Sequence, residues 1–216
     1  MHKNYIFFDL DGTITDPKEG ITKAVEYALA KFGIEVSDRE TLLPFIGPPL
    51  RDSFKEYCGF THEKANEAIK YYREYYTQCG GLYDCYVYPG MEKTLKTLHS
   101  RGKKIIMATA KPEDFSIQLM KHFNLDGLFD DICGASLDET RTHKDEVIGY
   151  ALEKNNITDV SQVVMIGDRN YDILGAKVFN IDTVGVLYGY GSEKEFKEAG
   201  ADFICQKPED LLNIIN

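Results

Sequence analysis

Acidic residues stand in pairs where two apolar runs of the sequence end. The stretch "IFFDLDGTITD" places Asp9 and Asp11 two positions apart after three apolar residues. Side chains alternate along a strand, so residues i and i+2 share a face, and carboxylates that close disfavour each other's ionisation. The stretch "VVMIGDRNYD" repeats the arrangement with Asp168 and Asp172. Carboxylate oxygens suit Mg²⁺, which often shares its coordination with substrate phosphates, so a divalent cation would offset the repulsion.

Two further residues suit a phosphate group. The apolar run "KKIIMAT" ends at Thr109, whose hydroxyl can donate to a phosphate oxygen together with the backbone N–H groups that follow it. Lys144 stands at a predicted helix start, where a cation is unfavourable toward the helix dipole, so another partner should hold it. Each residue alone has a plain structural explanation as a turn, cap or solvated residue. Their order and the matching strand-end positions favour the chemical interpretation.

Strand-like and helix-like segments alternate along most of the chain. The runs "YIFFDL", "KKIIMAT", "QVVMIGD", "DTVGVLYG" and "ADFICQ" are apolar without clean alternation, as in strands buried on both faces. Helical patterns separate them; one places Met91, Leu95 and Leu98 on a single stripe and stops at Gly102. The alternation predicts an α/β fold, a Rossmann-like doubly wound parallel sheet. Ligands of such sheets bind beyond the carboxyl ends of the strands.

A long helical insertion interrupts this alternation. We expect an α/β core formed by residues 1–16 and 87–216, and an all-helical cap formed by residues 17–86. Within the insertion, "SDRE" from Ser37 has the pattern of a capping box at a helix start. We expect its many tyrosines to pack between helices rather than to form a stacking platform.

Charge, cysteine content and hydropathy limit the class of protein. A net charge of −10 disfavours nucleic acid and anionic membranes as partners, because both require clustered Lys and Arg. Five cysteines with no C-x-x-C pair support neither a zinc site nor a disulfide framework, so we expect reduced thiols. The absence of a signal-peptide pattern and of any apolar run near about 18 residues predicts a cytoplasmic protein. Nothing in the sequence indicates an oligomeric state.

The motifs resemble those of the haloacid dehalogenase-like hydrolase superfamily over essentially the full length of the chain. "FFDLDGTITD" resembles motif I, "IIMATAKP" resembles motif II, Lys144 resembles the basic residue of motif III, and "MIGDRNYDILGA" resembles motif IV. The insertion between motifs I and II is similar to the small helical cap of the branch that contains phosphoglycolate phosphatases, as are "FIGPPLRDSF" and "YPGMEKTL". Motifs I and IV together are specific for the superfamily and much less specific for a substrate.

The resemblance implies the catalytic roles of two residues. Asp9 would be the nucleophile that forms an aspartyl-phosphate. Asp11 would protonate the leaving oxygen and then take a proton from the hydrolytic water. Because dehalogenase members lack this second acid, Asp11 favours phosphoryl transfer over halide displacement.

The resemblance also implies how phosphate and metal are bound. Thr109 and Lys144 would hold the transferring phosphoryl group. Ala110 stands where the family often has Ser or Asn, which leaves its backbone as the phosphate contact. The ligands of Mg²⁺ would be Asp9, the Asp11 backbone carbonyl and Asp168, with Asp172 as a direct or outer partner.

Three functions remain open at this point. The first is a Mg²⁺-dependent phosphatase for a small phosphorylated metabolite, such as phosphoglycolate, a 5'-nucleotide or pyrophosphate. The second is a sugar phosphomutase, in which Arg51 of the insertion could bind a second phosphate; Arg51 could equally be a surface residue of a helix. The third is a non-catalytic sensor of a phosphometabolite, against which the presence of Asp11 argues.

Overall fold

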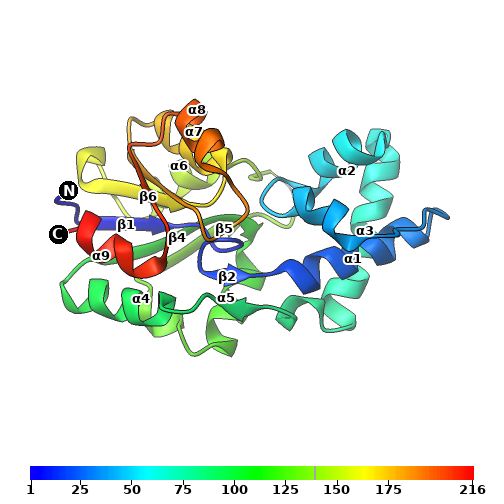
Figure 1. The fold of residues 1–216 in the computed structure, drawn as a ribbon, viewed down its shortest axis with the longest axis horizontal. Helices are drawn as coiled ribbons and strands as arrows, with labels where there is room; N and C mark the ends of the chain where they lie inside the picture. Colours follow the sequence, from blue (N-terminus) through cyan, green and yellow to red (C-terminus); the bar gives the residue numbers. More distant parts are fainter. Residues whose placement is uncertain (139) are drawn as a thin grey trace. The chain divides into compact units, whose positions relative to one another are not determined.

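The computed structural model describes residues 1–138 and 140–216, which form two compact units. Unit 1 comprises Met1–Asp16 and Val87–Asn216, and unit 2 comprises Pro17–Tyr86. Figure 1 shows the elements of both units in the colours of the sequence. That unit 2 acts as a cap stays a prediction.

Unit 1 is built on parallel strands that alternate with helices. Its strands are β1 (Tyr5–Phe8), β2 (Thr15–Asp16), β3 (Tyr86–Val87, which begins on the last residue of unit 2), β4 (Lys104–Pro112), β5 (Asp131–Ala135), β6 (Val163–Gly167), β7 (Asp182–Val186) and β8 (Phe203–Cys205). Its α-helices are α4 (Met91–Ser100), α5 (Glu113–His122), α6 (Lys144–Lys154), α7 (Asn170–Lys177), α8 (Glu193–Ala199) and α9 (Leu211–Ile214). Short 3-10 helices are η3 (Asp126–Leu128), η4 (Val160–Gln162) and η5 (Pro208–Asp210).

The main sheet has six strands in the order β5-β4-β1-β6-β7-β8, and every neighbouring pair is parallel. β2 and β3 form a separate two-stranded sheet. The predicted α/β class with a doubly wound sheet is confirmed. Because β1 lies between β4 and β6, the strand order reverses there, and such a switch point opens a ligand crevice at the carboxyl ends of the strands.

Helices cover both faces of the main sheet. In Figure 1, α6, α7 and α8 lie on one side of it, and α4 and α5 lie on the other. Ile6, Phe7 and Phe8 of β1 are all 0% exposed. Burial on both faces explains why this strand is apolar at every position instead of alternating.

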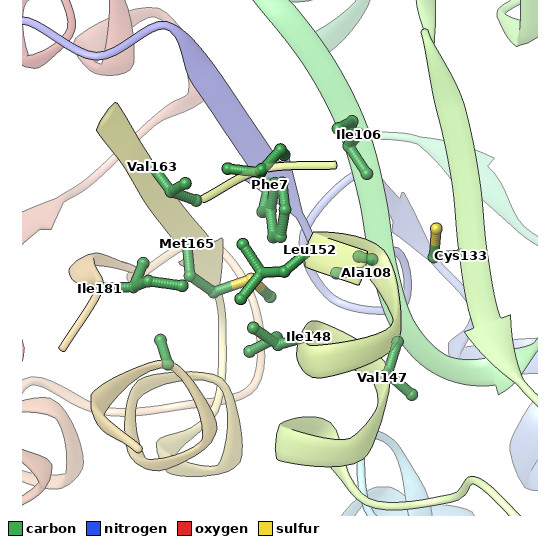
Figure 2. Close-up of a cluster of buried hydrophobic side chains, with 13 residues drawn as sticks. Phe7, Ile106, Ala108, Cys133, Val147, Ile148, Leu152, Val163, Met165 and Ile181 are labelled. Atoms are coloured by element: carbon green, nitrogen blue, oxygen red, sulfur yellow. The ribbon is translucent and has the colours of Figure 1, made fainter. Parts of the chain in front are cut away.

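One hydrophobic cluster fills the space between the sheet and helices α6 and α7. Figure 2 shows Phe7, Ile106 and Met165 from three adjacent strands directed toward Ile148 and Leu152 of α6. Each of these five side chains is at most 8% exposed. This packing fixes the start of α6 relative to the ends of β1 and β6, where the acidic residues stand.

Unit 2 is built from helices, and only its last residue belongs to a strand, β3. Its elements are α1 (Lys18–Ala30), η1 (Arg39–Phe45), α2 (Leu50–Cys58), α3 (His62–Gln78) and η2 (Gly81–Tyr83). α1 packs against α3, and their rings meet at Tyr27 and Tyr75, with centroids 5.4 Å apart. Tyr72 and Tyr76 are buried and stacked, as predicted for packing residues, whereas Tyr83 is 44% exposed.

The predicted capping box at Ser37 is wrong. Asp38 is the capping residue, and its carboxylate accepts a hydrogen bond of 2.9 Å from the backbone N–H of Glu40. The segment that follows is the 3-10 helix η1, which contains Pro44. Proline has no N–H to donate and its ring crowds the preceding turn, so an α-helix is disfavoured here.

The structure bears on two further predictions, the absence of a membrane-spanning segment and the reduced state of the cysteines. Across residues 1–138 and 140–216, no helix combines the length and apolar character needed to cross a membrane. All five cysteines are free, and Cys133 and Cys205 are buried. Burial raises the pKa of the Cys133 thiol to about 12, so this group stays protonated and unreactive.

Candidate active site

Three of the predicted acids meet at the carboxyl ends of β1 and β6. Asp9 follows β1, and its N–H continues the strand ladder by donating to the carbonyl oxygen of Ile166 at 2.9 Å. Asp168 follows β6, and Asp172 lies in the first turn of α7. One carboxylate oxygen from each of the three acids lies within 4.8 Å of the others, and all three residues are buried.

Lys144 joins this cluster from the first residue of α6. Its ammonium lies 2.8 Å from Asp9 Oδ1 and 2.8 Å from Asp172 Oδ1, and it donates to the carbonyl oxygen of Ala108 at 3.1 Å. Burial acts to lower the pKa of Lys144, but the charges of Asp172 and Asp9 outweigh it and raise that pKa above its ordinary value. These two carboxylates are the partners expected of a cation at a helix start.

Lys111 is a site residue that the sequence analysis missed. Its ammonium donates to both oxygens of Asp11, at 3.0 and 2.8 Å, and both residues are buried. Burial raises the pKa of the Asp11 carboxyl, while the charge of Lys111 acts against that rise. The available signal was spacing, since Lys111 follows Thr109 by two positions in a strand and should share its side of the sheet.

Two further oxygens of the acids accept hydrogen bonds from the backbone. Asp168 Oδ2 accepts a 2.9 Å hydrogen bond from the N–H of Tyr190, and Asp172 Oδ2 accepts one of 3.0 Å from the N–H of Arg169. Burial, with the neighbouring acids, raises the pKa of Asp168 well above its ordinary value. Burial raises the pKa of Asp172 to about 6. Both shifts mark buried carboxylates whose charged forms have lost their solvation.

The donor set fits a divalent cation. Lys111 and Lys144 place two ammonium groups against Asp9, Asp11 and Asp172, and the buried cluster can accommodate further positive charge. Oδ1 of Asp9 and Oδ1 of Asp172 touch the Lys144 ammonium but have no aligned hydrogen bond, so both can still accept a ligand bond. Asp9, Asp168 and Asp172 together offer the hard oxygen ligands that Mg²⁺ prefers.

The other predicted residues belong to β4 and to unit 2. Thr109 is 1% exposed at the end of the buried part of β4, and its Oγ1 accepts from the N–H of Lys111 at 3.2 Å, which leaves the hydroxyl proton available. Ala110 is half-buried beside it, and its backbone contact to phosphate stays a prediction. Arg51 belongs to α2 of unit 2, where its Nε donates to Asn66 Oδ1 at 2.8 Å; its substrate contact also stays a prediction.

Comparison with known proteins identifies the class of enzyme. The family model for the haloacid dehalogenase-like hydrolases matches residues 6–186. The chain belongs to this family, as its motifs predict, and the prediction of a phosphatase is confirmed at the level of enzyme class.

Individual relatives cover nearly the whole chain. A 5'-nucleotidase from Pseudomonas aeruginosa is 44% identical over 210 residues, which are 97% of this chain and 94% of that protein. A crystal structure of a predicted phosphatase from Clostridium acetobutylicum superposes with a TM-score of 0.96 at 46% identity and covers 99% of this chain and 98% of that one. The tyrosine-protein kinase PtkA of Mycobacterium tuberculosis is 34% identical over 86% of this chain and 62% of its own length.

Gly12 provides a test of the metal site. It adopts φ +83°, and a Cβ atom at this position would lie 2.1 Å from Asp168 Oδ2. We therefore expect Gly12→Ala to displace the Asp168 carboxylate and to weaken Mg²⁺ binding about 10- to 100-fold, measured by isothermal titration calorimetry.

Gly102→Ala is the matched control, because Gly102 adopts φ +74° but a Cβ atom there meets nothing within 4 Å. Both substitutions carry a similar backbone strain, about 1 kcal/mol or slightly more. Equal Mg²⁺ affinity in the two variants would contradict the assignment of Asp168 as a metal ligand.

Proposed function

We propose that the chain is a Mg²⁺-dependent phosphatase that acts on a small phosphorylated metabolite through an aspartyl-phosphate on Asp9. The observation that carries the proposal is the buried contact of Asp9 with Lys144, with Asp11 two residues further along the chain. A carboxylate nucleophile, a fixed cation beside it and a second acid are the groups that such a reaction needs.

In the first half of the reaction, the Asp9 carboxylate forms a bond to phosphorus as the bond from phosphorus to the substrate oxygen breaks. Asp11 donates a proton to that leaving oxygen. Lys144 and Thr109 hold the phosphoryl oxygens, on which negative charge increases. Asp9, Asp168 and Asp172 would hold Mg²⁺, which when bound would supply positive charge for the developing negative charge.

In the second half, water attacks the phosphorus of the aspartyl-phosphate and the bond to Asp9 breaks. Asp11 accepts the proton of that water, and inorganic phosphate leaves. Asp11 must therefore both give and take a proton. Its environment supports this role, because burial favours the protonated acid and Lys111 favours the carboxylate.

The substrate that we favour is a 5'-nucleotide. The support is the relative that is 44% identical over almost the entire chain and is a 5'-nucleotidase. The relative that is a tyrosine-protein kinase makes phosphotyrosine a necessary member of any substrate panel. Phosphoglycolate, pyrophosphate and hexose 1-phosphates complete the panel and cover the other small metabolites and the mutase alternative.

Substitution of the nucleophile tests the covalent mechanism. We expect Asp9→Asn to reduce phosphate release from a 5'-nucleotide by at least about 10³-fold, because an amide does not attack phosphorus. EDTA should abolish release by the wild type, and added Mg²⁺ should restore it.

Asp114→Asn is the control for Asp9→Asn, because Asp114 is an exposed acid of α5 and its variant should keep wild-type activity. If Asp9→Asn retained a tenth or more of the wild-type rate, Asp9 would not be the nucleophile. Tight binding of ligands without turnover by the wild type would identify a sensor instead.

Asp11 is tested by changing the leaving group. Asp11→Asn should lower kcat/KM on a 5'-nucleotide by about 10²- to 10⁴-fold, because kcat/KM reports the first half of the reaction, in which the leaving alkoxide needs a proton. The loss of kcat/KM on p-nitrophenyl phosphate should be much smaller, since nitrophenolate leaves without protonation. Losses of kcat/KM of the same size on both substrates would rule out Asp11 as the general acid.

A further inference from the structure

The segment Tyr188–Gly191, which connects β7 to α8, lies against Asp168. The backbone N–H of Tyr190 donates to Asp168 Oδ2 at 2.9 Å. The hydroxyl of Thr13 reaches the other oxygen, Oδ1, at 3.5 Å, which is long for a hydrogen bond. The Tyr190 N–H is therefore the stronger of these two restraints on the direction in which the Asp168 carboxylate points.

The glycines on either side of Tyr190 allow this close approach. A Cβ atom at Gly189 would lie 2.3 Å from the carbonyl oxygen of Gly12 and 2.4 Å from Asp168 Cβ. A Cβ atom at Gly191 would lie 2.1 Å from the carbonyl oxygen of Asp168. The backbone of the segment thus packs directly on Asp168, and no larger residue fits at either position.

Glycine also makes the segment flexible, so something else must hold it. The Tyr190 phenol donates to Asp16 Oδ1, and the Tyr188 phenol donates to the carbonyl oxygen of Thr13 at 3.1 Å. Both side chains therefore fasten the segment to the residues that follow β1. Asp16 is the last residue of unit 1 before the chain enters unit 2.

We propose that Tyr190 is a positioning residue for Asp168: its phenol, held by Asp16, fixes the backbone N–H that orients this carboxylate for the metal. The inference rests on the proposed function, because it takes Asp168 as a ligand of Mg²⁺. Groups that hold metal ligands in place commonly change metal affinity 10- to 100-fold when they are lost. Tyr190 itself touches neither the metal nor the substrate in this proposal.

The test is the affinity of Tyr190→Phe for Mg²⁺ alone, measured by calorimetry without substrate. The substitution removes the phenol and keeps the backbone N–H, so we expect binding about tenfold weaker than in the wild type. Tyr5→Phe, at the opposite end of β1, is the control and should leave the affinity unchanged.

A double-mutant cycle separates positioning from general destabilisation. If the Tyr190 phenol acts through Asp16, then Asp16→Ala combined with Tyr190→Phe should weaken Mg²⁺ binding no more than the weaker-binding single variant. Asp16→Asn should retain part of the affinity, because its amide oxygen can still accept the hydrogen bond. Thermal unfolding of the metal-free variants reports any loss of stability separately.

Two kinds of result would overturn the inference, and only one of them would also reject the metal in the proposed function. Wild-type affinity in Tyr190→Phe, or losses that simply add in the double variant, would reject the role of Tyr190 and leave the proposed phosphatase intact. Failure of the wild type to bind Mg²⁺ at millimolar concentration would reject the role of Tyr190 together with the metal in the proposed function.

Discussion

The site depends on one electrostatic constraint: buried carboxylates converge on too few cations. Asp9, Asp168 and Asp172 share a volume in which a single ammonium, that of Lys144, contacts two of them. Carboxylates this close are unfavourable in the interior of a protein unless they are protonated or paired with positive charge. The raised pKa values of Asp168 and Asp172 express that cost, and a divalent cation would remove it. In the proposed function, this unfavourable charge would be the basis of metal binding, and the bound metal would then attract the phosphate.

The fold sustains this constraint because the charged groups stand on rigid neighbours. β1 lies between β4 and β6, so the residues after these three strands lie at the same edge of the sheet. The cluster of apolar side chains under α6 fixes the helix that carries Lys144. The segment after β7 adds the restraint on Asp168. Most of the groups that hold the site residues in place follow different strands. The arrangement of the acids therefore requires the folded sheet, and no single sequence motif is sufficient for it.

The site residues that could be predicted are ionisable residues that stand at the end of an apolar strand or at the start of a helix. Residues that contribute through tertiary contacts were harder to predict from the sequence. The sequence identified Asp9 and Lys144 because ionisable groups at such positions need a reason. Lys111 left only the weak signal of a two-residue spacing from Thr109. Tyr190 left none, because its contact to Asp168 uses a backbone N–H, which nearly every residue has. The parallel strands were predictable from unbroken apolar runs. The capping residue of η1 was not, because neighbouring polar residues, Ser37 and Asp38, can both cap a helix and only the local geometry decides between them.

Calorimetry of Mg²⁺ binding in buffers of different ionisation enthalpy tests most directly whether the buried carboxylates form a metal site, because it also counts the protons that binding releases. Since burial raises the pKa of Asp172 to about 6 and the pKa of Asp168 well above its ordinary value, the metal-free chain carries more protons on these two acids at pH 6 than at pH 8. Metal binding requires the carboxylate form, so it should release protons at pH 6 and fewer at pH 8. We expect one Mg²⁺ per chain with that proton release. Absence of binding, or binding with no proton release at pH 6, would contradict it.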